Sequence, residues 1–174
     1  MTKRMDQTDF DTAFLFGDAA TATIVNGDHH QANSKALIEE ISLTAIAESG
    51  EVLNIPTAES KYTQLQGKKL FTFAVKTMSM IMHKCCQQAN IALNSVDLVI
   101  PHQANQRISN AVEKRLKMHP GTLYSNIARF GNTSSCTIPI ALSETLDKQS
   151  ENKTVALCAF GSGFTAAASL LRTK

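Results

Sequence analysis

The stretch VIPHQANQRI, Val99–Ile108, contains the junction that decides the fold. Its first residues end the apolar run SVDLVIP at 95–101, which predicts a buried strand. Its last residues begin a helical pattern, because apolar side chains recur every three or four positions over 104–117. His102 stands between the two. We therefore expect His102 at the carboxyl end of a strand, where open α/β sheets place their sites.

The flanking sequence repeats this alternation of strand and helix patterns. Residues 70–89 carry the strongest helix pattern. The segments 12–16 and 20–27 are joined by too few residues for a helix, so we expect them to pair as antiparallel strands. Continuous apolar strands alternating with helices predict an α/β fold, a layered mixed five-stranded sheet with helices on both faces. The remaining strands are expected at 38–48, 95–101, 154–161 and 164–172, and the remaining helices at 104–117 and 134–147.

Composition limits the class of protein. The 174 residues predict one domain, 1–174, that is long enough to bury a core without disulfides or metals. A net charge of +2 and an aromatic content of 6% without tryptophan argue against nucleic-acid binding. The four cysteines show no metal-ligand spacing, which is typical of reduced thiols in a cytoplasmic protein. No apolar run approaches the about 18 residues of a membrane helix, and because the first residues are polar we expect no signal peptide among them.

Three turns with polar residues and glycine are expected at one edge of the sheet: PHQAN at 101–105, FGNTSS at 130–135 and FGSGF at 160–164. In open α/β sheets, the carboxyl ends of strands and the neighbouring helix starts gather around one crevice. We therefore expect His102, Asn132 and the backbone amides of Gly161–Gly163 to face one cavity. A ring N–H, a side-chain NH₂ and backbone N–H groups together would stabilise a developing oxyanion.

Each of these residues also has an ordinary structural explanation. A lone histidine such as His102 is more often a structural residue with a satisfied hydrogen bond. Asn132 alone would be a turn residue or a helix cap, and Gly161 and Gly163 would permit a tight turn. The presence of all these residues in one sequence favours an oxyanion-stabilising site over the separate structural explanations. Cys136, in the expected first turn of a helix, is the one candidate nucleophile within the chain, although a small buried thiol is the simpler explanation.

The segments VIPHQANQRI, RFGNTSSCTIPIAL and AFGSGFTAAASLL resemble the second half of β-ketoacyl-acyl-carrier-protein synthase III, a condensing enzyme with the thiolase fold. FLFGDAATATIV and GKKLFTFAV are similar to two further segments of that half, and Asn132 follows His102 at the family's interval of 30 residues. The similarity covers nearly the whole chain, with the motifs in the family's order. The resemblance implies the C-terminal half of a thiolase-like fold.

The resemblance also implies an acyltransferase that performs a decarboxylative Claisen condensation of an acyl thioester with malonyl-acyl carrier protein, in fatty acid or related biosynthesis. His102 and Asn132 would be catalytic and would stabilise the enolate left by loss of CO₂, and the amide of Gly163 would belong to the oxyanion hole. The substrates would be acyl-CoA and malonyl-acyl carrier protein, with no cofactor. Asn105 and Phe71 would contact CoA or pantetheine. The cations expected to contact the acidic carrier protein are Arg107, Lys114 and Arg115.

The family's nucleophilic cysteine has no counterpart in this sequence. The resemblance therefore implies a C-terminal fragment, with MTKRMDQTDFD at 1–11 similar to an internal family segment. A missing N-terminal half or a partner subunit would supply the cysteine, so we expect the isolated chain to be inactive and to form homo-oligomers through an uncovered apolar face. Two other functions stay open. One is a non-catalytic partner that completes another chain's site, and the other is O- or N-acyl transfer with His102 as general base.

Overall fold

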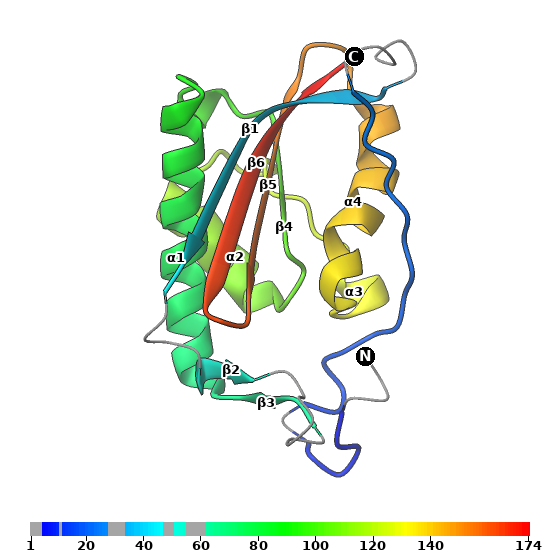
Figure 1. Ribbon diagram of the computed structural model, residues 1–174, viewed down its shortest axis with the longest axis vertical. Helices are drawn as coiled ribbons and strands as arrows, with labels where there is room; N and C mark the ends of the chain where they lie inside the picture. Colours follow the sequence, from blue (N-terminus) through cyan, green and yellow to red (C-terminus); the bar gives the residue numbers. More distant parts are fainter. Residues whose placement is uncertain (1–4, 11, 28–33, 47–50, 55–61) are drawn as a thin grey trace.

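A four-stranded mixed sheet forms the centre of the protein (Figure 1). The computed structural model describes residues 5–10, 12–27, 34–46, 51–54 and 62–174. The strands are β1 (Ala36–Ala45), β4 (Leu98–Pro101), β5 (Thr154–Gly161) and β6 (Thr165–Thr173). They lie in the order β1-β6-β5-β4, with β4 parallel to β5 and the other neighbouring pairs antiparallel. β5 has the bounds that the sequence predicts.

Helices cover both faces of this sheet, as predicted (Figure 1). α1 (Gly67–Gln88) and α2 (Gln106–Leu116) lie on one face, and α4 (Thr137–Thr145) lies on the other. Within the described ranges, no helix combines the length and the apolar character that crossing a membrane requires. The short elements are the paired strands β2 (Leu53–Asn54) and β3 (Gln64–Leu65), α3 (Ile127–Phe130), and the 3₁₀ turns η4 (Leu93–Ser95), η5 (Ser134–Cys136) and η6 (Leu146–Lys148).

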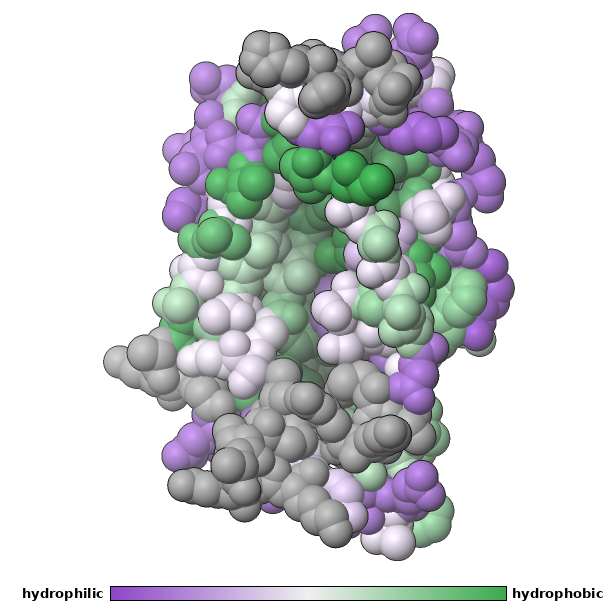
Figure 2. All heavy atoms as spheres, turned by 45° about the vertical axis from the view of Figure 1, so that its right-hand side comes forward, coloured by the Kyte–Doolittle hydropathy of each residue, from purple (hydrophilic) through white to green (hydrophobic). Residues whose placement is uncertain are grey.

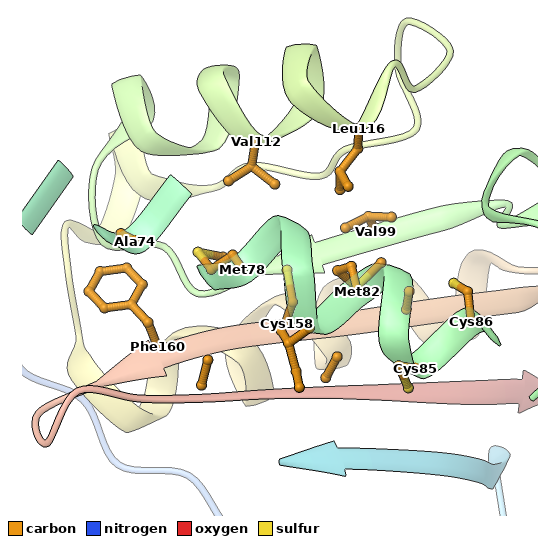
Figure 3. Close-up of a cluster of buried hydrophobic side chains, with 14 of the residues drawn as sticks. Ala74, Met78, Met82, Cys85, Cys86, Val99, Val112, Leu116, Cys158 and Phe160 are labelled. Carbon is orange, nitrogen blue, oxygen red and sulfur yellow. The ribbon is translucent and has the colours of Figure 1, made fainter. Parts of the chain in front are cut away.

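The main core lies between the sheet, α1 and α2 (Figure 3). Met78 and Met82 on α1 are fully buried, as are Val112 on α2 and Val99 on β4, and Cys158 on β5 is nearly so. Burial of a side chain of this kind contributes about 1.5–3 kcal/mol. The apolar stripe that predicts a helix at 70–89 is therefore also the surface that fixes α1 to the sheet.

Two strands predicted near the N-terminus do not form. Residues 12–15 form turns, and Phe16 makes only an isolated bridge to Asn132. Residues 20–27 are exposed and have no regular structure. The expected five-stranded sheet therefore has four strands among the described residues, because two of the six segments with a strand pattern form no strand. Small and β-branched residues favour extended backbone, but a strand is stable only beside a partner, and no described strand pairs with 20–27.

Candidate active site

The three predicted turns meet at a cavity of about 930 Å³. His102 follows β4, Asn132 precedes α4, and Gly161 ends β5, and all three line this cavity. The turns meet because β4 and β5 are parallel neighbours that end at the same edge of the sheet. Among the described residues, no acidic side chain lines the cavity. The site is therefore suited to a ligand that carries or develops negative charge.

The surrounding structure holds His102 in one orientation. Its backbone N–H donates a hydrogen bond to the carbonyl oxygen of Cys158, 2.7 Å away, and its ring packs edge-on against Phe160 with the centroids 5.4 Å apart. Nδ1 lies 2.6 Å from the hydroxyl of Thr137, so Nε2 is the ring nitrogen left for the cavity. Burial lowers the pKa of His102 to about 4. The imidazole is therefore neutral near neutral pH, and a neutral imidazole carries one N–H donor.

Asn132 is held by both its backbone and its side chain. Its N–H donates to the carbonyl of Leu15 (2.9 Å), and its carbonyl accepts from the N–H of Gly17 (3.0 Å). Its Oδ1 accepts a hydrogen bond from the backbone N–H of Ser134 at 2.9 Å. Because this bond occupies Oδ1, it assigns the orientation of the amide and leaves the Nδ2 donors for the cavity.

Gln103 is a supporting residue that the sequence analysis missed. It is completely buried, and its Nε2 donates to the carbonyls of Pro101 (2.8 Å) and Tyr124 (3.2 Å). Its Oε1 accepts from the backbone N–H of Asn126 at 3.1 Å. Gln103 thus joins the turn of His102 to the segment that leads to Asn132. The signal in the sequence is a polar side chain placed directly between a buried strand and an amphipathic helix.

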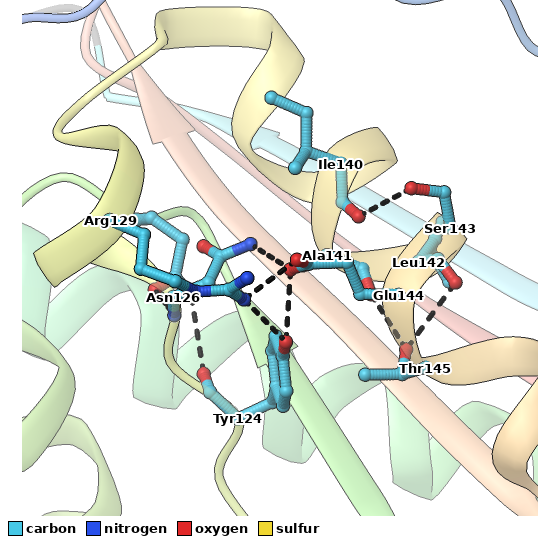
Figure 4. Close-up of polar contacts among 10 residues, drawn as sticks. Tyr124, Asn126, Arg129, Ile140, Ala141, Leu142, Ser143, Glu144 and Thr145 are labelled. Carbon is cyan, nitrogen blue, oxygen red and sulfur yellow. Dashed lines mark hydrogen bonds and ion pairs between the residues drawn. The ribbon is translucent and has the colours of Figure 1, made fainter.

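A polar cluster continues this support to α4 (Figure 4). The hydroxyl of Tyr124 and the side-chain amide of Asn126 both donate to Oε2 of Glu144, at 2.9 and 2.7 Å. Arg129 forms an ion pair with Oε1 of the same carboxylate at 2.7 Å. Three residues from the segment before Asn132 thus converge on one carboxylate. Local sequence patterns do not predict this cluster, because Glu144 lies 15–20 residues from its three partners along the chain.

Only some of the residues expected to contact the pantetheine arm or the carrier protein lie at the cavity. Asn105, Phe71 and Arg107 line it. Asn105 also caps α2, because its Oδ1 accepts the N–H of Arg107 at 2.8 Å. Lys114 and Arg115 are exposed in the last turn of α2 and do not line the cavity. The cations therefore extend from the cavity wall along α2.

The β5–β6 turn brings only part of the predicted glycine turn to the cavity. Gly161 and Ser162 line it, whereas Gly163, the residue expected in the oxyanion hole, is exposed and does not line it. Gly163 has a φ of +131°, and a Cβ there would lie 2.9 Å from Thr165. The glycine at 163 is thus required by the shape of the turn.

None of the four cysteines, all of which fall in the described part of the chain, lines this cavity or a second one on the α4 face of the sheet. Burial raises the pKa of Cys158 to about 12 and that of Cys86 to about 11, and it also raises the pKa of Cys85. The thiol of Cys136 donates to the carbonyl of Ala19 at 3.3 Å. Across the same described ranges, no group of three or more histidine, cysteine, aspartate or glutamate side chains could hold a metal ion.

A second cavity, of about 710 Å³, lies on the face of the sheet that carries α4. Leu43 and Ala45 of β1, Ala159 of β5, Ala167 of β6 and Ile138 of α4 contribute to its lining. Figure 2 shows this side of the molecule hollowed down its middle, with apolar residues around the hollow. His102 lines this cavity as well as the first. Its ring therefore stands between the two cavities.

Comparison with known proteins identifies related sequences. Residues 86–173 match the family model described as 3-oxoacyl-[acyl-carrier-protein] synthase III C terminal, and residues 1–42 match the model described as 3-oxoacyl-[acyl-carrier-protein] synthase III. The β-ketoacyl-[acyl-carrier-protein] synthase III of Clostridium tetani is 35% identical over 193 residues, and that of Oleidesulfovibrio alaskensis is 32% identical over 188 residues. Each alignment covers 99% of this chain and 57% of the relative.

Solved structures give the same result for the fold. 3-Oxoacyl-[acyl-carrier-protein] synthase III from Aquifex aeolicus superposes with a TM-score of 0.82 at 30% identity, over 97% of this chain and 54% of that one. The synthase III from Thermus thermophilus gives a TM-score of 0.84 at 29% identity, over 99% and 56%. The chain thus spans about half the length of the relatives it matches, and its α/β fold is that of the corresponding half. The chain belongs to the 3-oxoacyl-[acyl-carrier-protein] synthase III family, through the C-terminal region that residues 86–173 match.

Proposed function

We propose that the chain supplies the enolate-stabilising part of a ketoacyl synthase III, an acyltransferase that condenses an acyl thioester with malonyl-acyl carrier protein. In this proposal residues 1–174 act as one C-terminal domain. The observation that carries it is the pair of neutral donors at one cavity, the imidazole of His102 and the NH₂ of Asn132. Two neutral donors suit an oxygen that becomes negative during the reaction.

The chemistry follows from the positions of these donors. The thioester carbonyl of the malonyl group accepts hydrogen bonds from Nε2 of His102 and Nδ2 of Asn132. When the C–C bond to the carboxylate breaks, CO₂ leaves and the electron pair forms an enolate, whose oxygen both donors stabilise. The enolate carbon then attacks the acyl thioester and expels its sulfur as the leaving group. Loss of one donor of this kind slows a reaction by about 10²–10³-fold, or about 2.7–4 kcal/mol.

The cavity wall supports a substrate carried on a pantetheine arm. Phe71 offers an apolar surface to that arm, and Asn105 offers a polar one. Arg107 at the cavity wall, with Lys114 and Arg115 further along α2, would meet an acidic carrier protein. The proposed reaction draws on the two thioester substrates and needs no cofactor. The four free cysteines fit a reducing compartment such as the cytoplasm.

The nucleophilic sulfur would come from outside the residues that form this site. Three of the four thiols are buried with raised pKa values, and Cys136 lines neither cavity. In this proposal an N-terminal half or a partner subunit brings its cysteine to His102 through the second cavity. The inactivity expected from the sequence therefore applies to condensation, which needs the absent cysteine. The decarboxylation half-reaction is expected to remain at a slow rate, because loss of CO₂ requires the two donors and no thiolate.

The test is release of CO₂ from malonyl-acyl carrier protein by the purified chain. We expect slow release that falls about 10²-fold or more in His102→Ala and in Asn132→Ala. His119→Ala, which changes an exposed histidine, and Cys136→Ala serve as controls with unchanged release. Absence of release from the wild-type chain, or release that both site variants retain, would count against the proposal. If the chain alone performs condensation and Cys136→Ala abolishes it, then Cys136 is the nucleophile and the proposal is wrong on this point.

A second candidate is a non-catalytic subunit that completes the site of another protein. The absence of any cysteine from the lining of either cavity favours it. Such a subunit would bind malonyl-acyl carrier protein without releasing CO₂, which the same assay measures. O- or N-acyl transfer with His102 as general base is disfavoured, because an imidazole with a pKa of about 4 is a weak base.

A further inference from the structure

Thr137 contacts the ring of His102 and has no role in the reaction described above. Its hydroxyl oxygen lies 2.6 Å from Nδ1 of His102 and 3.0 Å from the carbonyl oxygen of Ser134. The side chain is 3% exposed, at the first residue of α4. A hydroxyl has one proton, so it can donate to only one of these two neighbours at a time.

The two choices give His102 opposite functions. If the hydroxyl donates to Ser134, then Nδ1 must carry the ring proton and donate to Thr137, and Nε2 presents a lone pair to the cavity. If the hydroxyl donates to Nδ1, then the ring proton is on Nε2 and points to the cavity. Only the second arrangement makes His102 a donor to an oxyanion, because a lone pair would repel the negative oxygen.

Two observations favour the second arrangement. The separation of 2.6 Å is shorter than the about 2.7–3.2 Å usual for an N–H···O bond, which argues against Nδ1 as the donor. The carbonyl of Ser134 already accepts the backbone N–H of Thr137, so it keeps a partner when the hydroxyl turns to the ring. When the hydroxyl donates to Nδ1 of His102, the hydroxyl, Nδ1 and the carbonyl of Ser134 all have hydrogen-bond partners.

We propose that Thr137 is a positioning residue that holds His102 in the Nε2–H tautomer by donating its hydroxyl proton to Nδ1. The catalytic consequence rests on the proposed function, but the tautomer itself does not. α4 thus contributes to the site through the first residue of the helix, although Thr137 lies 35 residues from His102 along the chain.

The experiment is ¹⁵N NMR of the full chain with labelled histidine side chains, near neutral pH. The signals of His102 are assigned by their loss in His102→Gln, and the exposed His83 and His119 serve as internal references for a ring in water. We expect a protonated Nε2 and an unprotonated Nδ1 in the wild-type chain. Thr137→Ser, which keeps the hydroxyl, should retain this pattern. Thr137→Val, which has the same shape without the hydroxyl, should give a mixture of the two tautomers.

A protonated Nδ1 in the wild-type chain would overturn the proposal, and this result does not depend on whether any variant folds. A wild-type pattern retained unchanged in a folded Thr137→Val would also overturn it, because the hydroxyl would then be unnecessary. The dispersion of the backbone amide signals in the same sample reports whether that variant is folded. The NMR result is independent of turnover, so failure of the decarboxylation assay leaves the tautomer test intact, and the reverse holds as well.

Discussion

His102 owes its neutrality to burial, since no charged group contributes to the shift of its pKa. The folded chain lowers this pKa from 6.5 to about 4. Between these two values the unfolded chain binds a proton that the folded chain does not bind. The free energy of unfolding must therefore rise as the pH rises from about 4 to about 6.5. Above that range His102 no longer makes it depend on pH.

Replacing His102 by glutamine should remove this dependence. We expect the wild-type chain to lose stability as the pH falls from about 6.5 to about 4, and His102→Gln to lose less. Urea unfolding at several pH values across the window measures the difference. His119→Gln, at an exposed histidine, is the matched control and should follow the wild type. An equal acid sensitivity of wild type and His102→Gln would mean that the ring is not protected from protonation.

At the level of the elements, caps and backbone contacts place the site residues. Asn105 begins α2 by accepting the N–H of Arg107, and it lines the cavity with the same side chain. The segment 15–17 holds Asn132 by two backbone hydrogen bonds, although it forms no strand. Each connection acts on a short segment, so each can be tested by one substitution.

The two functions of Asn105 can be separated. Asn105→Ala should lower the free energy of unfolding by about 1 kcal/mol, because the N–H of Arg107 loses its acceptor. Asn105→Ser should recover most of this stability, since serine is also a good cap. If Asn105 contacts the pantetheine arm, both variants should bind malonyl-acyl carrier protein more weakly, as isothermal titration measures. Recovery of binding in Asn105→Ser would assign Asn105 to capping alone.

Gly17 permits the close approach that holds Asn132. A Cβ at this position would lie 2.2 Å from the carbonyl oxygen of Phe130, which belongs to the backbone and cannot rotate away. We expect Gly17→Ala to lower the free energy of unfolding by about 1–3 kcal/mol and to reduce decarboxylation by moving Asn132. Gly27→Ala is the control, because a Cβ there meets nothing within 4 Å. Equal thermal stability and equal turnover of the two variants would contradict this explanation.

For the whole molecule, the main feature is a sheet covered unequally on its two faces. α1 contacts β1, β5 and β6 on one face, whereas α4 lies on the other beside the second cavity. On β1, which is an edge strand, Ile41 and Leu43 are 54% and 68% exposed. They are two residues apart and therefore point to the same face. Exposed apolar side chains on an edge strand favour association with another chain.

We expect the isolated chain to self-associate through this face. Light scattering should give a mass above that of one chain, increasing with concentration. Introducing charge with Ile41→Lys and Leu43→Lys should shift the mass toward the monomer. Met80→Lys, at a residue of α1 that is 44% exposed, is the matched control and should not. A monomer at high concentration, or equal effects of the two sets of variants, would contradict this expectation.

Local patterns along the chain account for much of the fold. The helical stripe at 70–89, the junction of strand and helix around His102, and the bounds of β5 can all be predicted from neighbouring residues. A helix satisfies its backbone through bonds between residues four apart, so its pattern and its hydrogen bonds occupy the same short segment. The turns of His102 and Asn132 can also be predicted to meet, because strand ends in an α/β sheet share one edge.

Contacts between distant segments decide the rest. The strand patterns at 12–16 and 20–27 fail because a strand also needs a neighbour, and a pattern within one segment carries no information about that neighbour. Gln103 and Thr137 act through partners 21–23 and 35 residues away, respectively, so their functions become visible only when those partners are in place. Residue types along the chain thus determine which donors are present and which helices form. The packing of β4, β5 and α4 determines which atom of each donor faces the cavity, because hydrogen bonds to distant segments set those orientations.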